Sequence, residues 1–445
     1  MREGILARTL RGPNRRRGHI AFVVLALAAC TAWFGPRAAF AQGSEQSVVA
    51  SIDTTSEAGE ADAAMPKRRM VKWNEYDGPV STLRFGYGFV WDIASYVQDD
   101  ASKSQFSLPT DNGLRDFRLL FKGRFKTKRD LTWTLGYMYD GTEEAWRFRQ
   151  TGFQIGLPEI SGRVFLGRTK EGFSQAKVMV GYYIVGMERS QTLDAFVPIL
   201  GDGIKYMGYW PKKRVFLNLG YFFDGLTTQA EKEKFAIYDH QTVTRLGWQP
   251  ILSDAEKKVL HVAVMSRFAT PDEGKIKFKS KPGSWLAPNF LDTGTLTGGK
   301  ATTWGLEANY RCGPWLFASE YDWQNLEVAG GGKPMFHGGE ISANWLVTGE
   351  TRPYNAAGGF YNQVTPNKSV FEGGRGALEL NLGYTFNDFT DGAIDGGKFW
   401  RVTPLVKWYL SEYFAFVGAY GFGELERFGV TGKTQFFQGR FVTIL

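Results

Sequence analysis

Positively charged side chains alternate with apolar ones in several short segments of the chain. Within Leu114–Lys126, the residues Arg118, Lys122 and Arg124 share one sequence parity, and Phe121 belongs to the other. Successive side chains of a β-strand point to opposite faces, so the three cations would share one face. Bulk water and salt screen isolated charges, but closely spaced cations around confined water can bind or conduct anions. This spacing therefore predicts one wall of a pore that handles anions.

Further cations occur in three other places. Arg147 and Arg149 alternate with Trp146 and Phe148, which predicts that both arginines point inward. Four lysines at a strict spacing of two would lie on one side of an extended segment: Lys275, Lys277, Lys279 and Lys281. Three more cations flank or lie in one long connection: Arg168, Lys170 and Arg189. Each could instead pair with a neighbouring acid, and the lysine run could bind lipid phosphates or be solvated, so all are candidates for pore lining or anion binding.

Residues that could carry out catalysis are scattered. His240, His261 and His337 show no metal-ligand spacing. Gly294–Lys300 (GTLTGGK) resembles a phosphate-binding loop, but Ala301 stands where that loop requires Ser or Thr, so we interpret it as a glycine-rich loop. A hydrolase barrel would need a Ser/His/acid set on its wall, and strand parity provides none. We therefore expect no catalytic residues, no metal and no cofactor.

The elements that would hold these side chains are short strands that alternate apolar with small or polar residues. In Asp130–Asp140, Trp133 and Leu135 share the outward parity, and Thr132 and Thr134 share the inward one. Sixteen strands are predicted: Val80–Val97, Leu114–Lys126, Asp130–Asp140, Ala145–Gly156, Ser161–Thr169, Gly203–Trp210, Val215–Phe223, Thr242–Gln249, Lys258–Phe268, Thr302–Arg311, Trp315–Val328, Phe336–Thr348, Gly376–Phe386, Lys398–Tyr409, Tyr413–Gly423 and Lys433–Leu445.

This pattern is typical of an all-β fold, a transmembrane antiparallel β-barrel, whose strands face lipid on one side and a lumen on the other. An even strand count brings both ends of the barrel to one side of the membrane. The tight connections Pro211–Arg214, Cys312–Pro314 and Leu410–Glu412 then fall together on the periplasmic side. The long connection Gly349–Arg375 would lie there as well, which is the exception to this regularity.

Two connections on the other side are long, Lys170–Asp202 and Ala269–Ala301. Loops of this length inside a compact fold are usually functional. A sixteen-stranded barrel encloses a wide lumen, so we expect one of these loops to fold inward and narrow it.

The first 41 residues have the composition of an export signal. They hold seven Lys or Arg, an apolar core at Ile20–Cys30 and a small-x-small site at Ala39–Ala41, which predicts a signal peptide over 1–41. Lipoprotein cleavage at Cys30 is the competing interpretation. Residues 42–70 are polar and acidic and are expected to form a disordered periplasmic linker. The barrel domain is then 71–445.

Removing the signal changes the charge argument. Residues 42–445 contain 46 basic and 44 acidic groups, a net charge of +2, so the overall charge of +8 does not indicate nucleic-acid binding. Cys312 is the one cysteine left, which excludes an internal disulfide. No run of eighteen apolar residues follows the signal, so the sequence excludes a helical membrane protein.

Several segments resemble the phosphate-selective porin family, the O and P type porins of bacterial outer membranes. They are GRTKEGFS (167–174), MERS (187–190), FVPILGDG (196–203), KFKSKPGSWLAPNFLDTG (277–294), VTGETRPYN (347–355) and GRGALELNLGYTFND (374–388). The resemblance implies a sixteen-stranded barrel, a homotrimer and a pore that favours anions. Members differ in selectivity, so phosphate transport does not follow. Leu445 departs from the Phe or Trp that usually ends such chains.

The sequence thus predicts a passive channel of the bacterial outer membrane. Its expected partners are small anionic solutes such as phosphate or other oxyanions, and outer-membrane lipid, with no nucleic acid. The alternatives are a general, non-selective porin and a barrel with a mainly structural or envelope-tethering role.

Overall fold

The computed structural model describes residues 74–223 and 238–445. The predicted signal peptide over 1–41 and the predicted linker over 42–70 lie outside these residues. No helix in the described ranges is long and apolar enough to cross a membrane.

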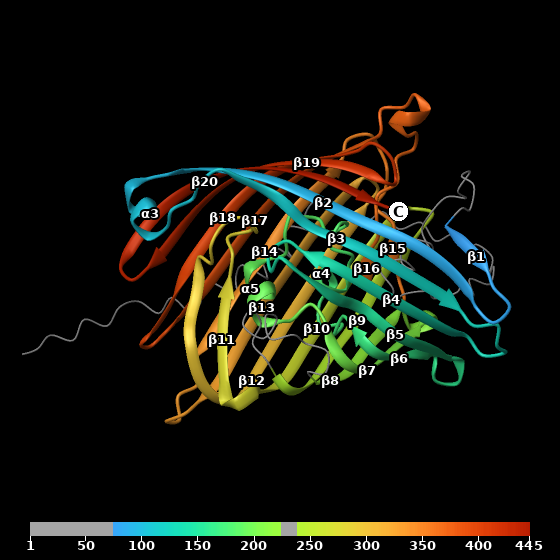
Figure 1. Cartoon of the computed structure of the whole chain (residues 1–445), viewed down its shortest axis with the longest axis horizontal. Helices are drawn as coiled ribbons and strands as arrows, with labels where there is room; N and C mark the ends of the chain where they lie inside the picture. The colour runs from blue at the N-terminus through green and yellow to red at the C-terminus, as the bar shows by residue number, and fades with distance from the viewer. Residues whose placement is uncertain (1–73, 224–237) are drawn as a thin grey trace, which may run out of the picture. The chain divides into compact units, whose positions relative to one another are not determined.

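The described chain forms a closed antiparallel barrel of sixteen strands, each hydrogen-bonded to its neighbours (Figure 1). The barrel closes where β2 pairs with β20, Trp91 lying opposite Phe441. The strands are β2 (Thr82–Gln98), β3 (Asp111–Arg124), β4 (Leu131–Asp140), β5 (Ala145–Leu157), β6 (Gly162–Thr169), β7 (Gly201–Trp210), β8 (Val215–Phe223), β9 (Tyr238–Ser253), β10 (Lys258–Pro271), β12 (Leu291–Cys312), β13 (Trp315–Val328), β14 (Met335–Leu346), β17 (Ala377–Asp391), β18 (Ile394–Tyr409), β19 (Phe414–Arg427) and β20 (Val430–Ile444). All sixteen predicted strands are confirmed.

Each strand has one apolar outer face. On β4, Leu135 and Tyr137 are exposed on the outer face. Met138, the next residue along the strand, is buried on the inner face. On β10, Val264 is 53% exposed and Arg267 is fully buried. Apolar side chains on the outside and charged ones on the inside are the arrangement of a strand between lipid and a polar lumen.

Two β-bulges alter this alternation on the wall that carries the predicted cations. No residue of β2 lies opposite Arg115 of β3, because the register of the two strands shifts between Val90 and Trp91. A second register shift lies between Leu135 and Tyr137 of β4. There the paired strand β5 contains one more residue than β4. A bulge lets two consecutive side chains take the same face, so it can add inward-pointing groups that parity does not predict.

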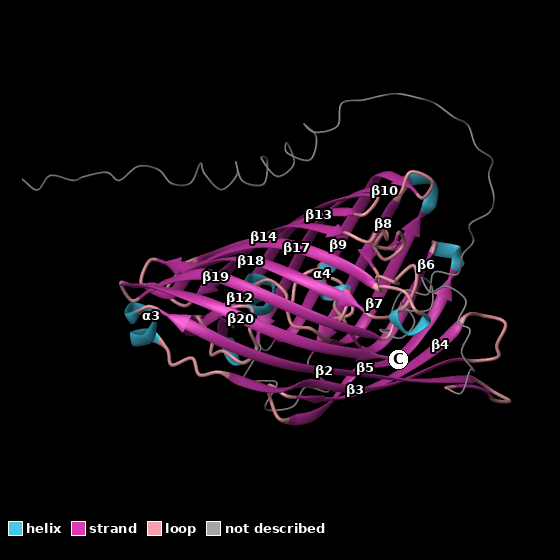
Figure 2. Cartoon of the chain, turned by 90° about the horizontal axis from the view of Figure 1, so that it is seen from above, coloured by secondary structure: helices cyan, strands magenta, loops and turns pink. Residues whose placement is uncertain are grey.

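The short elements lie in the connections or at the edge of the sheet. They are β1 (Glu75–Asp77), α3 (Asp100–Gln105), η1 (Pro158–Ile160), α4 (Gln175–Val178), α5 (Gln191–Phe196), η2 (Pro211–Lys213), η3 (Asp272–Gly274), β11 (Lys275–Ser280), β15 (Tyr354–Asn355), β16 (Phe360–Tyr361) and η4 (Val370–Glu372). Figure 2 shows α4 within the ring of strands. The constriction loop, residues 170–200, therefore folds into the barrel as predicted.

The connection predicted over Ala269–Ala301 is more regular than expected. Strand β10 continues to Pro271, and β11 pairs with the first part of β12, which already begins at Leu291. The segment Gly294–Lys300 is therefore part of a strand, and its interpretation as a loop was wrong. Its glycines lack side chains to reveal alternation, but Thr295–Thr297 pair with β11, and Gly298 and Lys300 pair with β13.

The connection over Gly349–Arg375 also folds inward, from the end of the barrel that carries the tight turns. Phe360 and Tyr361 pack against Val178 and Ile184 of the constriction loop. A long segment at this end was the exception in the sequence pattern, and its burial inside the barrel accounts for its length.

Candidate pore-lining site

Two cations of the constriction loop bind the loop's own backbone. The Lys170 ammonium donates to the carbonyl oxygens of Val178 and Met179, both at 2.9 Å. Arg189 donates from Nε to the Ala176 carbonyl at 2.7 Å. These carbonyls lie at or near the end of α4, where cations are favoured.

Strand β3 attaches the constriction loop to the barrel wall. Arg118 pairs with Asp116 at 2.8 Å, and its guanidinium stacks 4.2 Å from the ring centre of Tyr182. The Tyr182 hydroxyl donates to the same Asp116 carboxylate. Arg115 forms a two-bond pair with Glu188 of the loop at 2.8 and 2.9 Å. Both predicted and unpredicted cations of this strand therefore meet the loop.

The other predicted wall cations take different environments. Arg147 lies 3.4 Å from Asp140, and Arg168 lies 3.0 Å from Asp202. Arg124 is half-exposed at the strand end near Asp130, away from the constriction. Lys122 is partly buried on the same strand face as Arg118.

Arg149 and Arg189 bring two like charges together inside the barrel. Both are buried. Burial lowers the pKa of Arg189 to about 10; Asp194 opposes this shift, and the positive charges of Arg149 and Arg118 add to it. Such a concentration of positive charge would bind an anion, which relieves the repulsion.

The lysine run lies on β11 and just beyond it. Its apolar neighbours Ile276 and Phe278 are buried, so the lysines share the opposite face, as predicted. Three contacts of the run are those of Lys275 with Glu273 at 3.3 Å, of Lys277 with Asp292 at 3.1 Å, and of Lys281 with the Trp285 carbonyl. Lys279 is partly buried between them. The run therefore leads from an exposed lysine at one end to a mostly buried one at the other.

Lys281 lies at the inner end of this run. Burial lowers the pKa of its ammonium to about 8, and the positive charge of Arg115 adds to the shift, whereas Glu188 and Asp140 oppose it. Lys281, the inner end of the lysine run, therefore lies near the Arg115–Glu188 pair that attaches the constriction loop to β3.

Several buried ion pairs were not predicted. Arg245 and His261 both contact Glu307, at 2.7 and 2.9 Å, and Arg267 contacts Glu171 at 3.1 Å. Two more pairs are Arg352 with Glu379 at 2.7 Å and Arg440 with Asp92 at 2.6 Å. Arg115 was also missed, because its parity is outward. The adjacent charges Arg115 and Asp116 in an otherwise alternating strand were the available sign of a bulge.

The two sides of the interior differ in charge. Between residues 111 and 210 the buried side chains include nine Arg or Lys and three Asp or Glu. On β12–β14 they include Glu307, Glu320 and Asp322, against Arg311 alone among basic residues of those strands. The lumen therefore has a basic wall on β3–β7 and an acidic wall on β12–β14.

A closed barrel with outward apolar faces, a charged interior and an inward-folded loop defines a porin of the bacterial outer membrane. The family described as phosphate-selective porin O and P matches residues 83–428. The chain belongs to this family, which confirms the resemblance found in its segments.

Comparison with individual known proteins gives one short sequence relative and several similar structures. An uncharacterized protein of Caulobacter vibrioides is 40% identical over 95 residues, which are 21% of this chain and 19% of that relative. The anion-selective porin from Comamonas acidovorans has a TM-score of 0.51 at 14% identity, over 81% of this chain and 99% of that one. The trimer form of OmpT, an outer membrane protein of Vibrio cholerae, has a TM-score of 0.50 at 12% identity, over 82% and 100%. The two structural likenesses confirm the fold.

Proposed function

We propose that this porin passes small anions, such as phosphate or other oxyanions, in preference to cations. The observation that carries the proposal is the excess of buried Arg and Lys over Asp and Glu between residues 111 and 210. Placing so many cations in a confined space is costly unless anions share it. The family description and the anion selectivity named for the Comamonas acidovorans porin support it.

The residues proposed to bind the passing anion are the inward cations nearest the loop, Arg118, Arg149 and Arg189. Arg147, Arg168 and Lys170 would support the same wall, with Lys122 and Arg124 nearer its end. The lysines at 275, 277, 279 and 281 would collect anions toward it. We propose no catalytic role for any residue.

We also propose a homotrimer, supported by the trimer form named for the Vibrio cholerae structure. Residues 1–41 are proposed to direct export, and 42–70 to link the barrel to the periplasm. A general porin and a mainly structural barrel are the competing functions.

The selectivity test combines Arg118→Gln with Arg149→Gln. The double variant should shift the reversal potential, measured in a bilayer under a KCl gradient, toward cations. Asp116 keeps Tyr182 as a donor, and Arg149 lies near the like charge of Arg189, so folding should survive. Arg129→Gln, in a turn where the side chain is half-exposed, is the matched control and should leave the potential unchanged.

An unchanged potential in the double variant, with heat-modifiable migration intact, would leave a general porin. Little conductance in the wild-type protein would favour the structural alternative.

The pH dependence should report on Lys281. Its ammonium is charged below a pKa of about 8 and neutral above it, so anion preference should fall as pH rises from 7 to 9. Lys281→Gln should show a lower preference at pH 7 and a smaller change with pH. Burial also lowers the pKa of Lys177 to about 8, so the comparison between wild type and variant isolates Lys281. Equal pH profiles for the two proteins would remove Lys281 from the anion path.

A further inference from the structure

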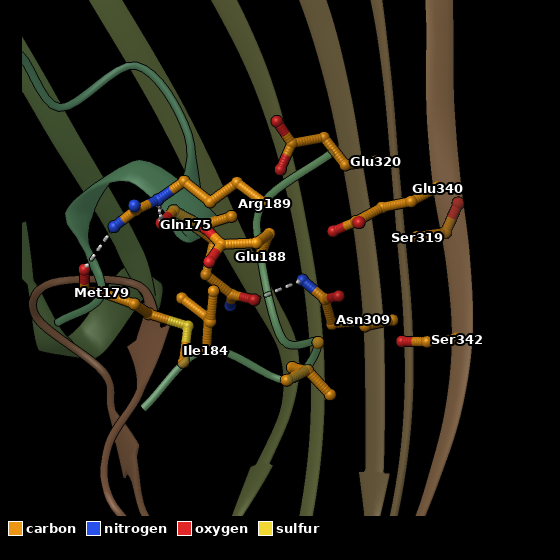
Figure 3. A pocket seen from close by; sticks show the side chains of 14 residues that line it. Gln175, Met179, Ile184, Glu188, Arg189, Asn309, Ser319, Glu320, Glu340 and Ser342 are labelled. Carbon is orange, nitrogen blue, oxygen red and sulfur yellow. Dashed lines mark hydrogen bonds between the residues drawn. The ribbon is translucent and has the colours of Figure 1, made fainter. Parts of the chain in front are cut away.

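A cavity lies between the constriction loop and the acidic wall. Figure 3 shows Glu320, Glu340, Asn309 and Ser342 on the wall side, and Gln175, Met179 and Arg189 belong to the loop. The cavity therefore lies between the loop, which contributes both Arg189 and Glu188, and the wall that bears Glu320 and Glu340.

Glu320 is the unusual group of this cavity. Its side chain lines the cavity and is 6% exposed, and its Oε1 atom has no hydrogen-bond partner among the described residues. A buried carboxylate oxygen without a donor is strongly unfavourable, because it has lost water and gained nothing in exchange.

The charges around Glu320 increase this cost. Its neighbours Asp322, Glu307 and Glu340 are also carboxylates. One cation that acts on Glu320 is Arg245, whose guanidinium already binds Glu307 at 2.7 Å and donates to the Gly359 carbonyl at 2.6 Å. Asp322, which shares the inward face of β13 with Glu320, is itself 1% exposed. The wall thus brings together several buried carboxyl groups with few cations to pair with them.

The surroundings favour an organic cation over a metal ion. No group of three His, Cys, Asp or Glu within the described residues is arranged to hold a metal. The cavity combines the Glu320 and Glu340 carboxylates and the Ser342 hydroxyl with apolar Met179 and Ile184. Carboxylates and hydroxyls accept the three hydrogen bonds of an ammonium group, and apolar side chains suit its short carbon chain.

We propose that this cavity is a subsite for the ammonium group of a small solute, with Glu320 and Glu340 as its acceptors. Arg189 lines the same cavity and lies near Arg118 and Arg149 of the basic wall. A solute that carries both an ammonium and a phosphate or carboxylate can then contact both walls. The porin therefore favours such zwitterions over the corresponding simple anions. The ammonium subsite does not depend on the proposed anion preference, but the zwitterion selectivity rests on that proposed function.

The test uses three matched compounds: ethylammonium, ethyl phosphate and O-phosphoethanolamine. Each is added to wild-type channels in a bilayer, and the concentration that halves the KCl current is measured. A charge-assisted hydrogen bond in a buried site predicts that O-phosphoethanolamine blocks at a concentration on the order of tenfold lower than ethyl phosphate. Glu320→Gln with Glu340→Gln should abolish this difference and weaken block by ethylammonium, but leave block by ethyl phosphate unchanged.

The matched control is Glu327→Gln on the same strand, where the side chain is 53% exposed and pairs with Lys333. It should behave as wild type. Equal ethylammonium block in wild type and the double variant would overturn the subsite and indicate instead that Glu320 and Asp322 share a proton. A third outcome is possible: ethylammonium block depends on both glutamates, but the channel shows no preference for O-phosphoethanolamine and no anion selectivity. This outcome would uphold the subsite. It would overturn the proposed function and the zwitterion selectivity.

Discussion

Replacing Arg352 by Ala should lower the free energy of unfolding by about 3–5 kcal/mol, the usual cost of breaking a buried ion pair. Arg352 is 2% exposed and donates to both oxygens of Glu379 at 2.7 Å. It also donates to the Tyr183 carbonyl of the constriction loop at 3.0 Å. Removing it leaves the Glu379 carboxylate buried without its main counter-charge and releases the inward-folded segment over 349–375.

Urea unfolding in lipid vesicles measures this loss. Arg352→Met combined with Glu379→Met should cost much less than Arg352→Ala with Glu379 retained, because no charge then remains unpaired. Arg129→Ala, which removes an exposed pair with Glu159, should cost under about 1 kcal/mol. Similar costs for Arg352→Ala and Arg129→Ala would show that the buried pair does not hold the segment.

Arginine at position 135 should destabilise the barrel by about 2–4 kcal/mol, because Leu135 lies mid-strand on the outer face and is exposed to the hydrocarbon region. Arginine at the adjacent Thr134 should cost far less, since that side chain shares the inward face with Lys122, directly across from it. The two substitutions add the same group one position apart. Comparable costs in the same urea experiment would contradict the assignment of faces.

The strands could be predicted because their signal is local. Arg118 and Phe121 belong to opposite parities whatever the rest of the chain does, so their faces follow from the sequence. The end of β12 near Leu291 could not be predicted in this way. The first part of β12 is rich in glycine. It pairs with β11 through backbone groups across the connection 281–290, and this pairing leaves no alternation of side chains in the sequence of β12.

The site was less predictable than the fold. Arg118, Arg149 and Arg189 could be named from parity and loop position. Arg115 could not, because a bulge reverses its face. Glu307 and Arg245 have inward parity on strands 62 positions apart, so nothing local pairs them. Glu320 is distinguished only by the carboxyl groups that surround it, and these come from several strands whose pairing the sequence does not show.

The pairing of β2 with β20 has a consequence for biogenesis. The backbone of Tyr87 exchanges hydrogen bonds with that of Leu445, so one edge of the first barrel strand has a partner only after the last strand has been delivered. Until then both strands have unpaired edges, which in water invite aggregation. The cylinder cannot grow from its amino-terminal half as a finished unit, and such distant pairing is slow. The exported polypeptide must therefore be kept from aggregating along its whole length until its two ends meet.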